Sequence, residues 1–415
     1  MAFDPEEFKR RRQLREQQRQ EEKAAKAKKL RLFSLIGGGI VLLVGILAIT
    51  LSLRGCDNAS TQETEPPNVT TIHLAATGDL NITQKVVDSG KNDDYSGLFL
   101  DVASILADAD ITTVNLEGGL YGAPYGVDSS APPALAQALK NAGVDLVQLA
   151  NSYSIYKGSA GLVSTVNSIK AAGLTPVGAW ADTAEAKAAK GYTIREVDGI
   201  KIAFVSFTKG FASRNDEMES MTLPAISQGC VNLLYTDYTT TYQEVDTQGI
   251  TKVLKAVAKE KPDITVALLH WGGEYNDTLS STQAEITELM LENGVNAIIG
   301  THPHFVQKMV YDENAGTFIA YSLGDFLGDV PEDGTEYSVI LDLEITKNLD
   351  TGKTQITGYS YTPIFTLAEE TGVRTVRIES AMAAYESGYL DKISDTTYAK
   401  MKYALERIEA RINGK

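Results

Sequence analysis

Three of the four histidines of this chain lie close together in the sequence, between His270 and His304. His270 ends the apolar run ITVALLH, and His302 and His304 follow the run AIIGT. A parallel strand delivers the residues that follow it to the carboxyl edge of its sheet. Imidazole nitrogen commonly binds zinc, iron or manganese, and a His-x-His pair can direct two rings at one ion or at two adjacent ions. The cluster predicts a metal site. The alternative is that these histidines only pack or cap beside Trp271 and Phe305.

Two carboxylates upstream have the chemistry to complete such a site. Asp79 follows the apolar run TIHLAATG, and Glu117 ends the run ITTVNLE. A two-metal hydrolytic site needs nitrogen and oxygen ligands, a carboxylate that bridges ions about 3.5 to 4 Å apart, and a proton donor. Glu117 is the candidate bridge. Asn81 and Asn115 could add neutral oxygen ligands.

The elements that must position these residues alternate along the chain. Apolar runs alternate with amphipathic stretches, which is typical of an α/β domain. The expected strands cover residues 71–79, 111–117, 144–151, 175–179, 201–208, 263–270, 295–304, 318–322 and 338–345, and the expected helices cover 95–109, 131–142, 159–172, 248–258 and 281–292. The polar residues that end these strands should meet at one edge of the sheet, where open α/β sheets bind ligands.

The N-terminal part of the chain indicates a membrane anchor. Residues 32–53 form an uncharged run of 22 residues, long enough to cross a bilayer, and the basic segment 1–31 before it should stay in the cytoplasm. That basic segment can also contact anionic lipids. Residues 54–71 are a polar, proline-containing linker, followed by the main domain at 72–365 and a helical extension at 366–415. We expect a single-pass cell-membrane protein whose main domain is extracytoplasmic.

Other features of the composition limit the alternatives. A cleaved signal peptide is less consistent with so long an apolar run, and lipidation of Cys56 is a second alternative. The only other cysteine, Cys230, is far away in the sequence and gives no disulfide framework. The net charge of −16 makes nucleic acid a poor partner for the outer domain.

The order of the motifs resembles the CapA family of capsule and poly-γ-glutamate biosynthesis proteins. The similarity covers about residues 71–363 and rests on GDLN at 78–81, NLEGGL at 115–120, HWGGEY at 270–275, GTHPHFVQ at 300–307 and YSLGDF at 321–326. The resemblance implies a four-layer α/β/β/α sandwich of the calcineurin-like metallophosphoesterase type. It implies one or two divalent ions, such as manganese, zinc or iron. One ion would be held by Asp79, Glu117 and His304, and the other by Glu117, an asparagine, His270 and His302.

The third motif departs from the family pattern. Members usually read LANNHxxDYG, whereas residues 149–158 read LANSYSIYKG. Ser152 therefore replaces a metal-binding asparagine, and Tyr153 replaces the proton-donating histidine. A tyrosine with a pKa of about 10 is a poor acid near neutral pH, which leaves the catalytic role of Tyr153 in doubt. Asn151 fills the ligand position if the loop is shifted by one residue.

Two further acids have alternative interpretations. Glu274 in HWGGEY either accepts the second N–H of His270 or is an exposed loop acid. Asp325 stands where the family has asparagine, and it either adds charge to the metal site or caps a turn.

Two functions follow from these patterns. The first is an extracytoplasmic metal-dependent hydrolase that acts on a phosphoester or on an anionic envelope polymer. The second is a non-catalytic subunit that binds the polymer or organises a membrane complex of synthase and export subunits. The change at Ser152 and Tyr153 leaves both open.

Overall fold

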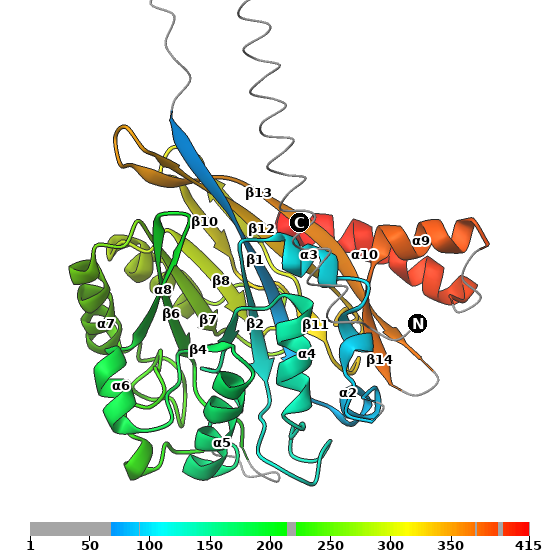
Figure 1. Ribbon diagram of the computed structural model, residues 1–415, viewed down its shortest axis with the longest axis horizontal. Coiled ribbons are helices and arrows are strands. Elements are labelled where there is room, and N and C mark those ends of the chain that lie inside the picture. The colour runs from blue at the N-terminus through cyan, green and yellow to red at the C-terminus, as the bar shows by residue number, and fades with distance from the viewer. Residues whose placement is uncertain (1–67, 91, 214–220, 370–371, 389–392, 415) are drawn as a thin grey trace, which may run out of the picture. The chain divides into compact units, whose positions relative to one another are not determined.

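Two β-sheets form the centre of the computed structural model, which describes residues 68–415 except 91, 214–220, 370–371, 389–392 and 415 (Figure 1). The predicted α/β class is confirmed. The predicted basic tail, the predicted membrane helix at 32–53 and the linker up to residue 67 lie outside the described residues. Within the described residues, no helix combines the length and the apolar character needed to cross a membrane.

The first sheet has eight strands, in the order β14-β13-β12-β1-β2-β3-β4, with β11 also paired to β1. Its strands are β1 (Val69–Asn81), β2 (Ile111–Glu117), β3 (Leu146–Gln148), β4 (Thr175–Val177), β11 (Asp325–Leu327), β12 (Tyr337–Asn348), β13 (Thr354–Ala368) and β14 (Val373–Arg377). Strands β1 to β4 are parallel, and β12, β13 and β14 continue the sheet in antiparallel pairs. The parallel half therefore brings the carboxyl ends of β1, β2 and β3 to one edge.

The second sheet has six strands, in the order β5-β6-β7-β8-β10-β9. Its strands are β5 (Tyr192–Val197), β6 (Ile200–Thr208), β7 (Ile264–His270), β8 (Ala297–Thr301), β9 (Met309–Asp312) and β10 (Thr317–Ala320). Strands β6, β7, β8 and β10 are parallel, and the two outer pairs are antiparallel. The carboxyl ends of β7 and β8 again share one edge.

The helices follow the expected alternation, with local corrections. They are α2 (Gln84–Asp88), α3 (Ala103–Asp108), α4 (Ala134–Ala142), α5 (Gly158–Ala171), α6 (Thr183–Ala189), α7 (Thr247–Glu260), α8 (Ser281–Glu292), α9 (Ile378–Glu386) and α10 (Asp395–Ile412), with 3-10 turns η1 (Ser96–Phe99) and η2 (Ala225–Ser227). The helix expected at 95–109 is divided into η1 and α3. The helix expected at 131–142 begins at Ala134, just after Pro132 and Pro133, because a proline disfavours the helical conformation of the residue before it.

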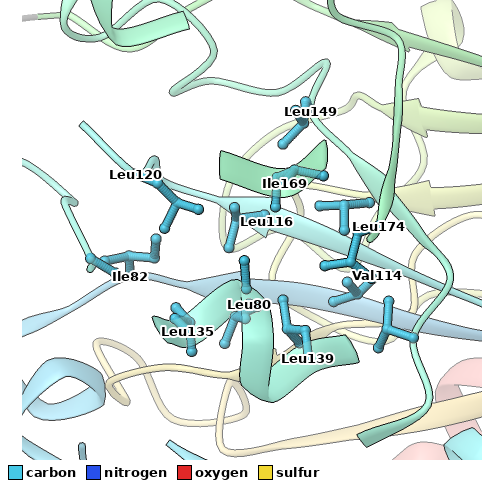
Figure 2. Packing of buried hydrophobic residues seen from close by; sticks show 14 of the residues in the cluster. Leu80, Ile82, Val114, Leu116, Leu120, Leu135, Leu139, Leu149, Ile169 and Leu174 are labelled. Atoms are coloured by element: carbon cyan, nitrogen blue, oxygen red, sulfur yellow. The ribbon is translucent and has the colours of Figure 1, made fainter. Parts of the chain in front are cut away.

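Three hydrophobic clusters fill the spaces between the layers. Successive side chains of β6 point to opposite faces of its sheet, so Ile202 and Phe204 belong to the cluster between the two sheets, whereas Ala203 and Val205 belong to the cluster beneath α7 and α8. The third cluster lies between the first sheet and helices α3, α4 and α5, where Leu80, Ile82, Val114, Leu116, Leu120, Leu135, Leu139, Leu149, Ile169 and Leu174 pack together (Figure 2). Helices thus cover the outer faces of two sheets that pack against each other.

The C-terminal segment differs from the expected helical extension at 366–415. Strand β13 continues to Ala368, and β14 follows it before α9 and α10 begin. The sequence VRTVR at 373–377 is rich in β-branched residues, and Val373, Thr375 and Val376 are buried when it extends the sheet. Only the part of the extension from Ile378 onward contains helices.

Candidate metal centre

Five predicted metal ligands come together where strands of both sheets end. Asp79 lies in β1, Glu117 ends β2, His270 ends β7, and His302 and His304 follow β8. All five side chains are buried. The side chains of Glu117, His270 and His302 offer ligand atoms within 4.8 Å of one another, and so do those of Asp79, Glu117 and His304. Glu117 belongs to both sets, which is the position expected of a carboxylate that bridges two ions.

Asp79 connects the first sheet to the loop after β8 that carries His302 and His304, which we call the histidine loop. Its Oδ1 accepts a hydrogen bond from Nδ2 of Asn115 at 2.5 Å. Its Oδ2 accepts one from the backbone N–H of His302 at 2.9 Å and lies 3.8 Å from Nδ1 of His304. These contacts fix the carboxylate against both elements that carry the other ligands.

A close backbone approach sets the position of Asp79. A Cβ atom at Gly78 would lie 1.7 Å from the carbonyl oxygen of Gly324, so only glycine fits there. The N–H of Asp79 donates to that same oxygen at 3.1 Å. The pairing of β1 with β11 and with β2 is irregular next to Asp79, and such irregularities redirect a side chain.

The backbone of the histidine loop has an unusual conformation, which sets the directions of the two rings. His302 and His304 have positive φ angles of 94° and 60°, on either side of Pro303. Non-glycine residues rarely adopt this conformation, and functional sites are among the places where it is found. The ring centroid of His302 lies 4.5 Å from that of His270 and 6.1 Å from that of His304.

Several buried atoms at this site have no hydrogen-bond partner among the described residues. They are both ring nitrogens of His302, Oε2 of Glu117 and Oδ2 of Asp325. Buried polar atoms in proteins nearly always have partners, and leaving one without a partner costs about 1 to 3 kcal/mol. Carboxylate oxygens and imidazole nitrogens are ligands of divalent transition metals. The donor set is therefore compatible with a divalent cation.

His270 contacts the altered third motif. Its Nε2 lies 3.0 Å from Oγ of Ser152 and 3.4 Å from Oε1 of Glu117. Its Nδ1 lies 3.2 Å from Oγ1 of Thr301 and 3.5 Å from Nδ2 of Asn115. The serine therefore occupies a place at the site, next to the nitrogen that faces the bridging acid.

Asn151 holds the third-motif loop in place through its side-chain amide. Its Nδ2 donates to Oδ1 of Asn115 at 3.0 Å and to the carbonyl oxygen of Leu116 at 2.7 Å. Its Oδ1 accepts from the N–H of Tyr153 at 3.0 Å. The amide of Asn151 therefore ties the loop to β2.

Tyr153 lies at the rim of the site but is a weak acid. Burial and the charge of Glu117 raise the pKa of Tyr153 to about 12. Its ring packs against Tyr156 at 5.3 Å, and its carbonyl oxygen accepts a hydrogen bond from the hydroxyl of Tyr121 at 2.6 Å. A phenol with such a pKa gives up its proton poorly near neutral pH.

Asp325 lies beside His304, which the sequence alone left undecided. Its Oδ1 lies 2.7 Å from Nδ1 of His304. Burial disfavours the cationic ring, yet the charge of Asp325 and this hydrogen bond raise the pKa of His304 well above its usual value. Asp325 therefore adds a negative charge to the Asp79 side of the centre.

Glu274 is exposed and lies near the two loop histidines. Its exposure agrees with the alternative of an exposed loop acid, and its carboxylate is placed so that it could share an ion with His302 and His304. Together with Ser152 and Tyr153 it lines a pocket of about 330 Å³ that reaches the centre. The site is therefore accessible to a small polar group.

Burial favours the neutral form of the other ionisable ligands. Burial and repulsion from Glu117 raise the pKa of Asp79 to about 7, and burial raises that of Glu117 to about 7. Burial lowers the pKa of His270 to about 3 and places that of His302 well below its usual value. A bound cation would stabilise the ionised carboxylates and needs neutral imidazoles as ligands.

One residue near the centre was missed in the sequence analysis. Lys209 follows β6, and its Nζ donates to the carbonyl oxygen of Gly272 at 2.9 Å and lies 4.6 Å from the ring centre of Tyr242. Burial lowers the pKa of Lys209. Its position just past the run KIAFVSFT follows the same rule that identified His270. The fourth histidine, His73, pairs instead with Asp342 at 2.8 Å, outside the ligand sets.

Residues 73–330 match the family described as bacterial capsule synthesis protein PGA_cap. The chain belongs to this family. The matched residues include all five candidate ligands described above.

Two named bacterial proteins are similar to part of this chain. The chain is 28% identical over 226 residues to the PGA biosynthesis protein CapA of Bacillus subtilis and 27% identical over 219 residues to the capsule biosynthesis protein CapA of Bacillus anthracis. Each alignment covers 53% of this chain and spans about half of the relative, 52% and 48% respectively.

Similar solved structures include a phosphatase of Mycoplasma pneumoniae, which is 14% identical to this chain and has a TM-score of 0.44. The superposition covers 72% of this chain and 95% of the phosphatase chain. Another is the calcineurin-like phosphoesterase YfkN of Bacillus subtilis, with 15% identity, 81% and 100% covered, and a TM-score of 0.43.

Proposed function

We propose that this protein is a metal-dependent hydrolase of capsule or poly-γ-glutamate biosynthesis, acting on a phosphoester or on a linkage in an anionic envelope polymer. The observation that carries the proposal is His302, a buried histidine whose two ring nitrogens have no hydrogen-bond partner among the described residues and which faces His270. A buried imidazole without partners is costly unless it binds something. The relatives' names supply the biological context.

The residues present provide two sets of candidate ligands, and we expect one of them to bind an ion more weakly than the other. Asp79, Glu117 and His304 would hold one ion, with Asp325 adding charge beside it. Glu117, His270 and His302 would hold a second, with Ser152 in the place of the amide ligand. A bound manganese, zinc or iron ion would supply Lewis-acid activation of a phosphoryl or carbonyl oxygen. Tyr153 would orient the substrate by hydrogen bonding and would contribute little as an acid.

The proposal is tested with the full-length protein in detergent. After purification without added metal, bound metal is counted, and hydrolysis of phosphodiester, phosphomonoester and polyglutamate substrates is measured with manganese and zinc. We expect bound metal and turnover that is lost in His302→Ala and kept in the matched control His73→Ala, which changes a surface histidine. Metal binding that is equal in both variants would contradict the assignment of the site.

A second function is favoured by one observation. The raised pKa of Tyr153 leaves the third motif without an efficient proton donor, as expected of a polymer-binding or scaffolding subunit that works with membrane synthase or export partners. In that case the protein binds metal and polymer but hydrolyses neither phosphoesters nor polyglutamate. The same measurements separate the two functions, because only the hydrolase gives turnover.

We also propose that residues 32–53 anchor the chain in the cell membrane, with the N-terminus in the cytoplasm and the main domain outside. The support is the uncharged run preceded by the basic segment 1–31. In intact cells, an impermeant thiol reagent should label a cysteine introduced at exposed Lys400 and should not label one introduced at Phe8 in the basic segment, in a chain lacking Cys56 and Cys230. The reverse labelling would contradict this orientation.

A further inference from the structure

A second and larger concavity lies away from the metal centre, between helices α6 and α7. It has a volume of about 1120 Å³, and it shares none of its lining residues with the pocket at the centre. Both helices lie at the left of Figure 1, beside the second sheet. Part of its lining is apolar and includes Phe207, Val231 and Leu233. We call this concavity the lysine groove, after the five lysines that line it.

These five lysines come from both helices. On α7, Lys252, Lys255 and Lys259 are spaced by three and four residues, so they lie on one face of the helix, about one turn of 5.4 Å apart. Lys187 of α6 and Lys190 at its C-terminal cap belong to the opposite wall. All five are exposed. Two rows of ammonium groups thus border one groove.

The charge of the groove is opposite to that of the chain. The whole protein has 38 basic and 54 acidic residues, whereas Asp246 is the only acid among the described residues that line the groove. Asp246 is already engaged, since its Oδ1 accepts from the N–H of Gly249 at 2.8 Å. Lys190 lies 3.7 Å from Glu260, and within the described part of the chain the other four groove lysines form no ion pair.

We propose that the lysine groove binds an extended polycarboxylate chain, namely the anionic polymer on which the proposed function acts. Repeated ammonium groups on flexible stems neutralise repeated carboxylates without fixing one geometry, which suits a uniform polymer that must slide. No arginine is among the described lining residues, so binding would depend on the point charges of the lysine ammonium groups. The apolar lining accepts the methylene groups of such a chain.

The shape of the groove distinguishes a polymer from a membrane surface. A bilayer presents a broad, nearly flat layer of charge, which binds basic residues that project from a surface. Here the lysines line an open hollow between two helices. In a protein with a net charge of −16, a local basic groove also offsets the repulsion that an acidic polymer would meet elsewhere.

The test measures binding of fluorescently labelled polyglutamate to the full-length protein in detergent. The variant Lys252→Gln/Lys255→Gln/Lys259→Gln removes three charges from exposed positions and keeps the helix-forming character of α7. We expect the affinity to fall by about tenfold or more at low salt, and the wild-type affinity to fall as salt screens the charges. The matched control, Lys353→Gln/Lys400→Gln/Lys402→Gln, removes the same charge elsewhere and should change affinity less than twofold.

Other outcomes separate this proposal from its alternatives. Equal loss in both triple variants would overturn it, because net charge alone would then explain binding. Unchanged polymer binding in the α7 variant, with loss of binding to vesicles containing anionic lipid, would overturn it in favour of a membrane surface. A polymer affinity that depends on the α7 lysines supports the groove even where no hydrolysis is found, and metal content measured on the same variant reports the metal centre independently.

Discussion

The hydroxyl oxygen of Ser152 lies 3.0 Å from Nε2 of His270, the ring nitrogen that also faces Oε1 of Glu117 at 3.4 Å. The other nitrogen of that ring faces Thr301. Metal binding by His270 on the side of the bridging acid therefore has to include the serine or displace it. A serine hydroxyl has a shorter reach than the amide oxygen of asparagine. The affinity of the weaker ligand set for an ion should therefore depend on Ser152.

Restoring the family's residues in this loop should strengthen the second ligand set. We expect Ser152→Asn/Tyr153→His to bind more metal per chain than the wild type, because the amide oxygen can reach an ion held by Glu117, His270 and His302. Metal stoichiometry measured by atomic emission after gel filtration checks this. The single variant Tyr153→His is the matched control and should change turnover more than stoichiometry. An unchanged metal count in the double variant would show that Ser152 is wrongly assigned to the ligand position.

Removing metal should lower the thermal stability of the protein. A ligand that binds only the folded state at a concentration about 100 times its Kd stabilises that state by about 2.7 kcal/mol, which for a domain of this size is a Tm change of about 4 °C. We expect a chelator to cause a decrease of this order and added manganese or zinc to reverse it. Calorimetry of the full-length protein in detergent measures both. A Tm that is indifferent to chelator and to both metals would argue against a metal centre.

The candidate metal ligands could be grouped from the sequence because each lies near the end of an apolar strand or just past it. That rule needs no knowledge of how the two sheets pack, so it placed Asp79, Glu117 and His270 at the correct edge. The same rule applied to Lys209, but a lysine was not expected at a metal site. The strand β14 was missed because VRTVR is short and is followed directly by a helix.

The finer features of the centre depend on tertiary contacts that leave no local signal. Asn151 is held by Asn115 and the backbone of Leu116, both on another strand, and only the folded loop shows that its amide is already used. The contact of Asp325 with His304 depends on the positive φ of the histidine loop. The lysine groove likewise depends on the proximity of α6 and α7, which are separated by two strands in the chain.

Replacing His302 should separate metal binding from folding. The ring of His302 makes no side-chain hydrogen bond within the described residues, so His302→Ala should lower the metal-free stability by only about 1 to 3 kcal/mol, the usual cost of a small cavity. The same variant should lose the increase in Tm that metal gives to the wild type. Urea unfolding with chelator and calorimetry with metal measure the two effects. His73→Ala should keep the metal effect, and a metal-dependent increase retained by His302→Ala would remove His302 from the ligand set.

Replacing Asp325 should test whether its charge supports metal binding at His304. Carboxylates that hydrogen-bond to a metal-binding imidazole orient the ring, and losing one typically lowers metal affinity by about 10-fold to 100-fold. We expect Asp325→Asn to show a decrease of that size in titration calorimetry with manganese or zinc, because the charge beside Nδ1 of His304 is lost while the shape is kept. Asp329→Asn is the matched control, since Asp329 lines the same pocket but contacts Thr83 and Lys85. Equal affinities of Asp325→Asn and wild type would mean that Asp325 only holds the turn that follows Gly324.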